Sequence, residues 1–390
     1  MSEQLLTVGD LYQRARETLP EIAAGAGERE RLRVLPHAQI RQIARLRLLT
    51  FRVPAALGGP GASVSQVIRF VIDVAAVDAN IAQALRPAFL FVEGLVASDL
   101  PEWTQRWLPR VLAGDIFGTA GWERGAANGV VQARLIPDGQ NFRAKGTKSY
   151  STGALFADWV SASALNPDGE VVSFTVPRDR EGLRLLDDWD GTGQRLTASG
   201  TTQLDNMLVY PDEIRTLPGR GHRSPGTAFA QLFLAAVLAG IAANARDDAV
   251  QYARHHARPI KHSQAERSAD DPYVQHAIGH IAALAFAADA AVSQAASVLD
   301  RAISADAEPQ LLTEAAVAVA EAQFFAAEAA LRSGELAFEA GSASATLREY
   351  NLDRHWRNAR TVANHNPRAY KAAVAGAYWL NGTEPPDALF

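Results

Sequence analysis

Histidine, arginine and hydroxyl side chains are the groups of this sequence that could do acid–base or binding chemistry, because its 390 residues include no cysteine. The most informative histidine is His365, which stands in the run His365-Asn-Pro367 just before a predicted helix. A helix N-terminus attracts anions and favours a neutral imidazole. The segment 354–383 around it carries five basic residues and no acid, which suits an anionic ligand. Arg357 and Arg360 also fit one helix face, so structural ion pairs stay open as an alternative for both.

Two further segments offer polar groups that could bind a ligand. Residues 214–246 again lack any acid, and Arg258-Pro-Ile-Lys-His262 follows soon after them. The run Lys148–Gly153, KSYSTG, places hydroxyls and backbone amides at the end of a predicted strand. Each segment alone is a weak signal, and their order along the chain is more informative than any one of them.

Metal and nucleotide motifs are weak in this sequence. His276 and His280 stand four apart on a predicted helix, but no third ligand has a suitable spacing, so we expect no metal site. The glycines at 58–61 and 191–193 fit turns better than phosphate-binding loops, since neither group opens a helix after a parallel strand. The sequence contains no P-loop, G-x-S-x-G or H-E-x-x-H pattern, which are the usual signatures of nucleotide hydrolases, α/β-hydrolases and zinc proteases.

The composition is that of a globular protein with two or three domains, with 48% hydrophobic and 21% charged residues. The lack of cysteine excludes disulfides, iron–sulfur clusters and thiol nucleophiles, so redox chemistry would require a bound organic cofactor. A net charge of −5 argues against nucleic acid as the main partner. The N-terminus has no apolar signal-peptide core, which predicts a cytoplasmic protein. The uncharged, alanine-rich stretch 228–245 is interpreted as a core helix, so no membrane contact is expected.

Hydrophobic periodicity divides the chain into three parts. Residues 1–115 are predicted to form an N-terminal helical domain, with helices over Leu5–Leu19, Arg31–Leu49, Ser63–Val77, Ile81–Leu100 and Glu102–Leu112. Residues 116–220 are predicted to form a central antiparallel β sandwich or barrel, with strands over 130–136, 141–151, 159–165, 171–177 and 201–211. Residues 221–390 are predicted to form a C-terminal domain, with long helices over 227–257, 272–304 and 309–340 and a shorter one over 367–380. These alanine-rich helices suit an antiparallel bundle that continues across an oligomer interface.

This order of helical, β and helical parts resembles the acyl-CoA dehydrogenase fold, and four local motifs share the resemblance. They are RVPAALGGPGAS at 52–63, G-x-K-x-Y-x-T-G at 146–153, DWDGTGQRLTASGTTQLDNMLVYPDE at 188–213 and DRHWRNAR at 353–360. The resemblance implies an α+β multidomain protein. It would have an N-terminal helical domain, a central antiparallel β domain and a C-terminal four-helix bundle that binds flavin and forms the oligomer.

Within this superfamily, the sequence is more similar to the branch of flavin-dependent monooxygenases that includes dibenzothiophene monooxygenases and sulfur-acquisition oxidoreductases. The similarity rests on Arg258-Pro259, on Asp271-Pro-Tyr273 and on the run from Trp356 to Pro367. Acyl-CoA dehydrogenases need a carboxylate to remove the α-proton of the substrate. Both places where that family carries it fall within 214–246 and 354–383, where this sequence has no acid.

The resemblance to the monooxygenase branch implies roles for individual residues. His365 would lie near flavin C4a as a hydrogen-bond partner or proton shuttle. Trp122 would contact the flavin, and Arg258 would reach its phosphate, from the same or a neighbouring subunit. Gln83 stands where the desulfurising enzymes place a histidine, and it can hydrogen-bond but cannot shuttle a proton near neutral pH. The remaining implied contacts, which flank the isoalloxazine, are Tyr150, Ser151 and Thr152, and the candidate catalytic residues are His365, Thr152 and Gln83.

The function implied by the resemblance is oxygenation of a small organosulfur, amine or aromatic substrate by a two-component monooxygenase. A separate NAD(P)H-flavin reductase would supply reduced FMN, whose reaction with O2 gives a C4a-hydroperoxide. FMN is favoured over FAD, because the glycine-rich segment that contacts FAD in the superfamily reads EAGSAS here, at 339–344. The resemblance also implies a homotetramer, arranged as a dimer of dimers. Two alternatives stay open: an acyl-CoA dehydrogenase that uses FAD and a relocated base, and a catalytically silent flavin-binding paralogue.

Overall fold

The computed structural model describes residues 6–125, 130–216, 223–341 and 343–387, and it begins with six helices. These are α1 (Val8–Ala23), α2 (Ala26–Leu32), α3 (His37–Arg45), α4 (Val64–Val77), α5 (Ala79–Val96) and α6 (Pro101–Ala113). The single helix predicted over Arg31–Leu49 was wrong. Helix α2 ends at Leu32, because Arg33 adopts a left-handed φ of 56° and Pro36 cannot donate a helical hydrogen bond.

The middle of the chain folds into one eight-stranded sheet. Its strands are β1 (Phe117–Ala120), β2 (Arg134–Asp138), β3 (Asn141–Lys148), β4 (Trp159–Leu165), β5 (Val171–Pro177), β6 (Leu183–Leu185), β7 (Thr202–Val209) and β8 (Ile214–Thr216). The strand order is β6-β7-β3-β2-β4-β5-β8, with β1 paired to β4. The prediction of a purely antiparallel sheet was wrong in two places, since β1 and β2 both pair with β4 in parallel. Strands β1, β6 and β8 were missed, because three or four residues are too few to show alternation.

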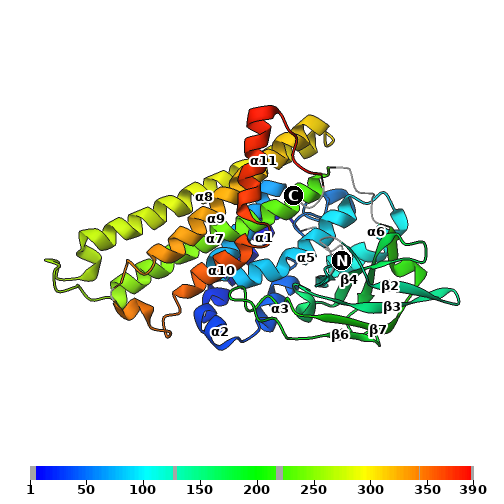
Figure 1. Cartoon of the computed structure of the whole chain (residues 1–390), viewed down its shortest axis with the longest axis horizontal. Helices are drawn as coiled ribbons and strands as arrows, with labels where there is room; N and C mark the ends of the chain where they lie inside the picture. The colour runs from blue at the N-terminus through cyan, green and yellow to red at the C-terminus, as the bar shows by residue number, and fades with distance from the viewer. Residues whose placement is uncertain (1–5, 126–129, 217–222, 342, 388–390) are drawn as a thin grey trace.

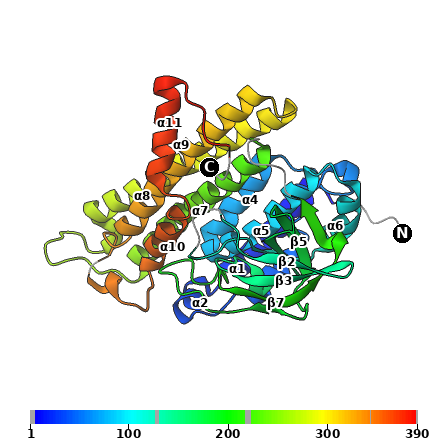
Figure 2. The same cartoon turned by 45° about the vertical axis from the view of Figure 1, so that its right-hand side comes forward.

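Five helices complete the chain: α7 (Pro225–His255), α8 (Pro272–Ser304), α9 (Pro309–Leu336), α10 (Asp353–Ala363) and α11 (Arg368–Asn381). The three long helices α7, α8 and α9 run side by side and project from the rest of the molecule (Figures 1 and 2). Helices α10 and α11 pack on α9. The sequence did not separate α10 from its surroundings, although it placed two arginines of this segment on one helix face. The boundary predicted at 220/221 lies in 217–222, outside the described residues.

The two helical parts share one hydrophobic core, while the sheet has its own. Helix α4 packs along α7, and buried side chains from Leu11 to Ala363 form one continuous cluster. The elements between the helices and the sheet are therefore held by two packed cores, that of the helices and that of the sheet. A site placed there is held by rigid parts of the molecule.

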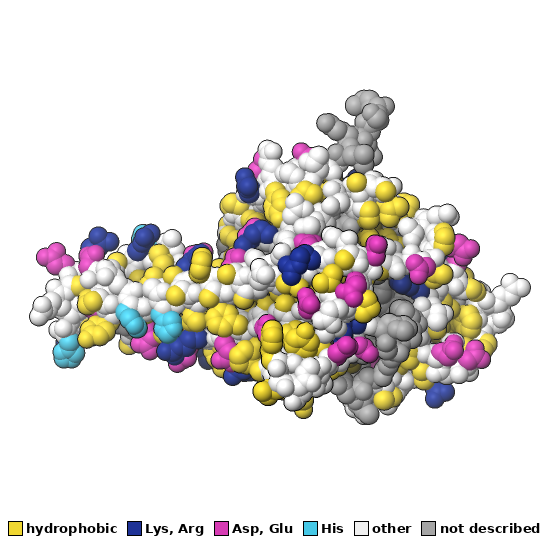
Figure 3. Space-filling model, turned by 90° about the horizontal axis from the view of Figure 1, so that it is seen from above, with side chains coloured by type: hydrophobic (Ala, Val, Ile, Leu, Met, Phe, Trp, Pro, Cys, Tyr) yellow, Lys and Arg dark blue, Asp and Glu magenta, His cyan; other side chains and the backbone are white. Residues whose placement is uncertain are grey.

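Two helices, α7 and α8, are long and apolar enough to cross a membrane by length and composition alone. The apolar window of α7 is 78% buried within the molecule, which confirms the core helix predicted at 228–245. The window of α8 is only 33% buried, and Tyr273 and Phe286 of this helix are exposed. Apolar side chains also lie along the projecting bundle in the space-filling view (Figure 3).

Candidate active site

The segment Ser149–Gly153 follows the C-terminal end of β3 and turns sharply. Ser149 pairs with Trp122, whose carbonyl oxygen accepts a 2.7 Å hydrogen bond from the Ser149 amide. Tyr150 then adopts a φ of 57°, a conformation that a non-glycine residue rarely takes and that often marks a functional site. Trp122 and Tyr150 are both exposed, at 39% and 46%. The turn therefore presents two accessible aromatic side chains, both of which were predicted to contact a cofactor.

The hydroxyl of Thr152 begins a short chain of hydroxyl groups. Thr152 Oγ1 lies 2.8 Å from Ser199 Oγ, which lies 2.7 Å from Thr197 Oγ1. Thr197 Oγ1 donates to the carbonyl oxygen of Gln194 at 2.9 Å. A carbonyl oxygen can only accept, so the hydroxyl protons point from Thr152 to Ser199 and from Ser199 to Thr197, and Thr152 Oγ1 keeps its lone pairs for a hydrogen bond from a ligand.

The side chain of Ser151 is buried, whereas that of its neighbour Tyr150 is exposed. Ser151 is 1% exposed, and its hydroxyl accepts a 2.8 Å hydrogen bond from Thr202. Its amide donates to the carbonyl oxygen of Gly200. These hydrogen bonds join the turn at Ser151 to β7 and the residues before it. The predicted contact of Ser151 with a cofactor stays a prediction.

Helix α5 packs directly on this turn and carries Gln83. A Cβ atom at Gly153 would stand 2.5 Å from the carbonyl oxygen of Ala84, so only glycine permits this contact between turn and helix. Gln83, one residue earlier, is 6% exposed, and its Oε1 atom is buried without a hydrogen-bond partner in the described part of the chain. A buried amide oxygen without a donor is costly, so Gln83 is positioned to accept a hydrogen bond from a ligand.

His365 follows the last turn of α10 and precedes α11. The side chain of its neighbour Asn366 donates a 2.5 Å hydrogen bond to Gln231 Oε1 on α7, which anchors this loop. Although the residue is exposed overall, the surrounding protein atoms desolvate its ring. Together with the positive charges of Arg86 and Lys371, this holds the pKa of His365 well below its ordinary value. The imidazole is therefore neutral at pH 7, as the sequence predicted.

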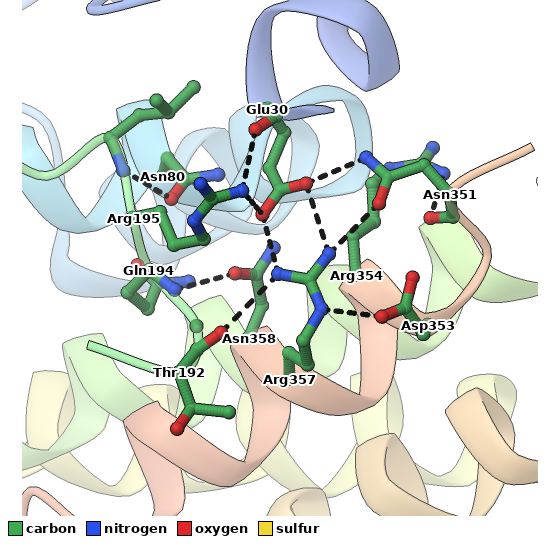
Figure 4. Close-up of polar contacts among 12 residues, drawn as sticks. Glu30, Asn80, Thr192, Gln194, Arg195, Asn351, Asp353, Arg354, Arg357 and Asn358 are labelled. Atoms are coloured by element: carbon green, nitrogen blue, oxygen red, sulfur yellow. Dashed lines mark hydrogen bonds and ion pairs between the residues drawn. The ribbon is translucent and has the colours of Figure 1, made fainter. Parts of the chain in front are cut away.

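A polar network fixes α10, and with it the loop that carries His365 (Figure 4). Asn358 and Thr361 of α10 accept hydrogen bonds from the amides of Gln194 and Gly193, at 2.7 and 2.9 Å. The amide of Leu196 donates to Asn80 on α5 at 3.1 Å. The segment 193–199 thus links α10, α5 and the hydroxyl of Thr152. Sequence reasoning quoted this segment as a motif but did not single out Asn80, Thr197, Ser199, Asn358 or Thr361, since their partners lie far away in the chain.

The basic residues of the acid-free segment 354–383 are largely engaged by other elements. Arg357 binds Glu30 of α2 at 2.7 Å, and Arg368 binds Glu328 of α9 at 2.6 Å. Arg354 pairs with Asp248, and Arg360 donates to Asn364. The structural reading of Arg357 is therefore confirmed, and the arginines of this segment do not form the field for an anion that its composition suggested.

Within one subunit, Arg258 lies far from the other predicted site residues. It is exposed in the loop that follows α7, at the far end of the projecting bundle. From Gln231, beside the His365 loop, to the end of α7 at His255, the helix rises by roughly 35 Å. Arg258 can join the site only if it comes from a neighbouring subunit, which is one of the two arrangements that the sequence left open.

The described residues contain no group of three His, Cys, Asp or Glu side chains that could hold a metal ion. The rings of His276 and His280 lie 6.3 Å apart on α8.

The remaining groups fit a flavin. Trp122 and Tyr150 offer aromatic surface, Thr152 and Ser199 offer hydroxyls, and Gln83 offers a buried amide oxygen for a ring N–H. The charged side chains that act on His365 are cations, and no carboxylate acts on it in the part of the chain that the structure describes. Such a site can bind a flavin and hold hydrogen bonds to it, but it offers no carboxylate base at His365.

Comparisons with known proteins agree with this geometry. Residues 10–115 match the family model "Acyl-CoA dehydrogenase, N-terminal domain", and residues 232–368 match "Acyl-CoA dehydrogenase, C-terminal domain". The chain is 31% identical to the dibenzothiophene monooxygenase of Mycolicibacterium goodii, over 97% of this chain and 95% of that protein. It is 30% identical to SfnC of Pseudomonas putida, described as a probable FMNH2-dependent monooxygenase, over 96% of each chain.

A solved structure shows the same architecture. The FMN-bound crystal structure of TdsC from Paenibacillus sp. A11-2 is 29% identical and superposes with a TM-score of 0.89, covering 97% of this chain and 99% of that one. The predicted fold class, with its helical, β and helical parts, is thereby confirmed.

Proposed function

This chain belongs to the acyl-CoA dehydrogenase family, and within that family we propose that it is a flavin-dependent monooxygenase. It uses reduced FMN and O2 to oxygenate a small organosulfur compound. The relatives and the solved structure described above support this assignment, since they are named as monooxygenases of sulfur compounds, as FMNH2-dependent or as FMN-bound. FAD is the alternative cofactor.

The observation that carries the proposal is the charge around His365. An acyl-CoA dehydrogenase requires a carboxylate that removes the α-proton of a thioester. In the described part of this chain, the charged side chains that act on His365 are Arg86 and Lys371, and the ring of His365 is neutral. A neutral imidazole can donate one hydrogen bond and accept another, which suits proton management during oxygen chemistry better than abstraction of a carbon-bound proton.

The proposed function gives each candidate site residue a separate role. When bound, reduced FMN supplies the electrons for activation of O2. We assign Trp122 and Tyr150 to contact with the ring system, and Gln83 Oε1 to acceptance of a ring N–H. Thr152 donates into its hydroxyl chain, which leaves the lone pairs of Thr152 Oγ1 to accept a hydrogen bond from the flavin. His365 holds or releases a proton at one ring nitrogen.

The proposed monooxygenase reaction also requires a source of reduced flavin, and we propose an oligomeric assembly for the protein. A separate NAD(P)H-flavin reductase supplies the reduced cofactor, and a cytoplasmic location gives that reductase its nicotinamide. A homotetramer, a dimer of dimers, covers the exposed apolar side chains of α8, where Tyr273 is 82% and Phe286 76% exposed. In that assembly, Arg258 of a neighbouring subunit reaches the flavin phosphate.

Titration with flavin in both redox states tests the proposed function. We expect reduced FMN to bind at least about tenfold more tightly than oxidised FMN, a difference of ~1.4 kcal/mol. The purified protein should consume O2 only when reductase and NAD(P)H are present. Tightly bound FAD that loses its yellow colour on addition of an acyl-CoA would identify a dehydrogenase instead. Flavin binding with neither bleaching nor oxygenation of any substrate would identify a silent paralogue.

A further inference from the structure

An almost completely buried ion pair in the sheet has no role in the site described so far. Lys148, the last residue of β3, is 0% exposed, and its Nζ atom lies 2.5 Å from Oε1 of Glu123. The side chain of Glu123 is 5% exposed and also accepts hydrogen bonds from the amides of Gln132 and Ala133, at 2.9 and 3.1 Å. Burial opposes ionisation of Glu123, but these hydrogen bonds outweigh it and hold the pKa of the carboxyl below its ordinary value. Glu123 is therefore ionised at pH 7, with Lys148 as its counter-charge.

A buried ion pair contributes little to stability by itself. The cost of removing two charges from water largely offsets their attraction, and an apolar pair of similar size is often at least as stable. Such a pair does restrict geometry, because neither charge can leave its partner without a large penalty. The two segments that carry Lys148 and Glu123 are therefore fixed relative to each other.

The ion pair belongs to a network that holds the backbone of Trp122 on both sides. Lys148 Nζ also donates to the hydroxyl of Ser163 on β4 at 3.3 Å, and this hydroxyl donates to the carbonyl oxygen of Gly121 at 3.0 Å. The carbonyl oxygen of Trp122 itself accepts the 2.7 Å hydrogen bond from the amide of Ser149. The residue that follows Trp122 carries the buried carboxylate. Three successive residues are thus held against the sheet.

The indole of Trp122 is held far less than its backbone. The residue is 39% exposed, and among the described residues no hydrogen bond or ring contact fixes its side chain. The direction of the indole therefore depends on the backbone that carries it. The guanidinium of Arg124, two residues later, lies 5.0 Å from the centre of the Tyr150 ring, so the same segment also contacts the turn after β3.

We propose that Glu123 and Lys148 are positioning residues, which hold Trp122 in the orientation in which its indole meets the flavin. The inference rests on the monooxygenase function proposed above and on the contact of Trp122 with the flavin. Because Lys148 directly precedes the turn, one ion pair sets the position of Trp122 relative to Tyr150 and Thr152. A binding residue whose support is removed loses its productive geometry, even though the support never touches the ligand.

The orientation of Trp122 can be measured without any turnover. The seven tryptophans of the chain can be replaced biosynthetically by 5-fluorotryptophan, so that each gives its own ¹⁹F NMR signal. Trp122→Phe identifies the signal of Trp122. We expect Glu123→Gln and Lys148→Met each to shift or broaden this signal in the flavin-free protein, while the other tryptophan signals stay in place.

Binding of reduced FMN then shows whether the orientation matters to the cofactor. Anaerobic calorimetric titration should give a Kd about 3- to 10-fold higher in Glu123→Gln than in the parent. Trp122→Ala should weaken binding as well. In the Trp122→Ala background, Glu123→Gln should cause no further loss of affinity, because it acts through the indole that has been removed.

A matched control separates positioning from stability. Glu213 is 1% exposed and pairs with Arg180 at 2.5 Å, in a second buried ion pair of the same domain. Glu213→Gln should destabilise the fold to a similar degree, but it should keep the Trp122 signal and the affinity for reduced FMN. The double variant Glu123→Gln/Lys148→Met leaves no lone buried charge, so it serves if Lys148→Met does not fold, and it should shift the Trp122 signal as well.

The outcomes separate the inference from the function on which it rests. An unchanged Trp122 signal in Glu123→Gln and Lys148→Met, or an equal loss of FMN affinity with and without Trp122, would overturn the positioning role. If the signal moves but Trp122→Ala binds reduced FMN like the parent, the ion pair orients Trp122 and the flavin contact of Trp122 is wrong. If the parent binds no reduced FMN while the signal still depends on the pair, the proposed function is wrong and the orientation of Trp122 by the pair stands.

Discussion

Replacement of His365 by alanine is expected to reduce product formation by about 100-fold or more, while O2 uptake continues. The reason is that a positioned acid–base group contributes about 10²–10⁴-fold to the step that it serves. His365 is the one residue of the candidate catalytic set with an imidazole, which can take up a proton at one ring nitrogen while it releases one from the other and so stays neutral overall. Without it, the electrons of the reduced flavin should appear as H2O2 rather than in product, and the ratio of H2O2 to product measures this directly.

Two further variants define the role of His365. His365→Gln keeps a donor and an acceptor but loses proton exchange, so it should restore flavin binding without restoring product formation. His255→Ala removes an exposed histidine at the end of α7 and should behave as the parent. Unchanged coupling of O2 uptake to product in His365→Ala would remove His365 from the mechanism.

Replacement of Glu30 by glutamine is expected to lower the free energy of unfolding by about 3–5 kcal/mol, because it leaves Arg357 buried with half of its counter-charge. Glu30 is 1% exposed and accepts hydrogen bonds from Arg357 at 2.7 Å and from Asn351 at 2.6 Å. The pair joins α2 to α10, which carries the His365 loop. Chemical denaturation at pH 7 measures the loss, and Glu28→Gln is the control. Glu28 lies on the same helix in an exposed pair with Arg31, so its loss should cost less than about 1 kcal/mol.

The pH dependence of the Glu30 variant gives a second check with a defined sign. Burial opposes ionisation of Glu30, but hydrogen bonds from Arg357 and Asn351 outweigh it and hold the pKa of the carboxyl below its ordinary value of 4.5. A depressed folded-state pKa stabilises the fold above the unfolded-state pKa, and this stabilisation is lost as the pH falls through the folded value. The stability difference between parent and variant should therefore be full at pH 7 and shrink below about pH 4. A difference that is small at pH 7, or that grows on acidification, would contradict the assigned pair.

Local pattern accounted for most of the fold because its long helices and alternating strands carry strong periodic signals. Strands 159–165 and 171–177 and the helix 272–304 have the predicted bounds. The wrong or missing predictions concern strand pairings that depend on tertiary contacts, and strands that are too short to show a pattern. The parallel pairing of β1 with β4 cannot be read from either strand, and β6 has only three residues.

The candidate site was predictable only where one segment carries its own signal. The missing acid in 354–383 was visible in the sequence, but the partner of Arg357 was not, since Glu30 stands 327 residues earlier. The hydroxyl chain from Thr152 to Thr197 likewise depends on how two distant turns meet.

Oxygen-isotope labelling of the product tests the central claim, that the bound flavin works with O2 because the site lacks a carboxylate base. The protein, its reductase, NAD(P)H, FMN and a small organosulfur substrate are incubated under ¹⁸O2, and the product is examined by mass spectrometry. We predict a product in which each added oxygen atom is ¹⁸O, with none incorporated from labelled water. Unlabelled product, or anaerobic reduction of the bound flavin by an acyl-CoA thioester, would contradict the account.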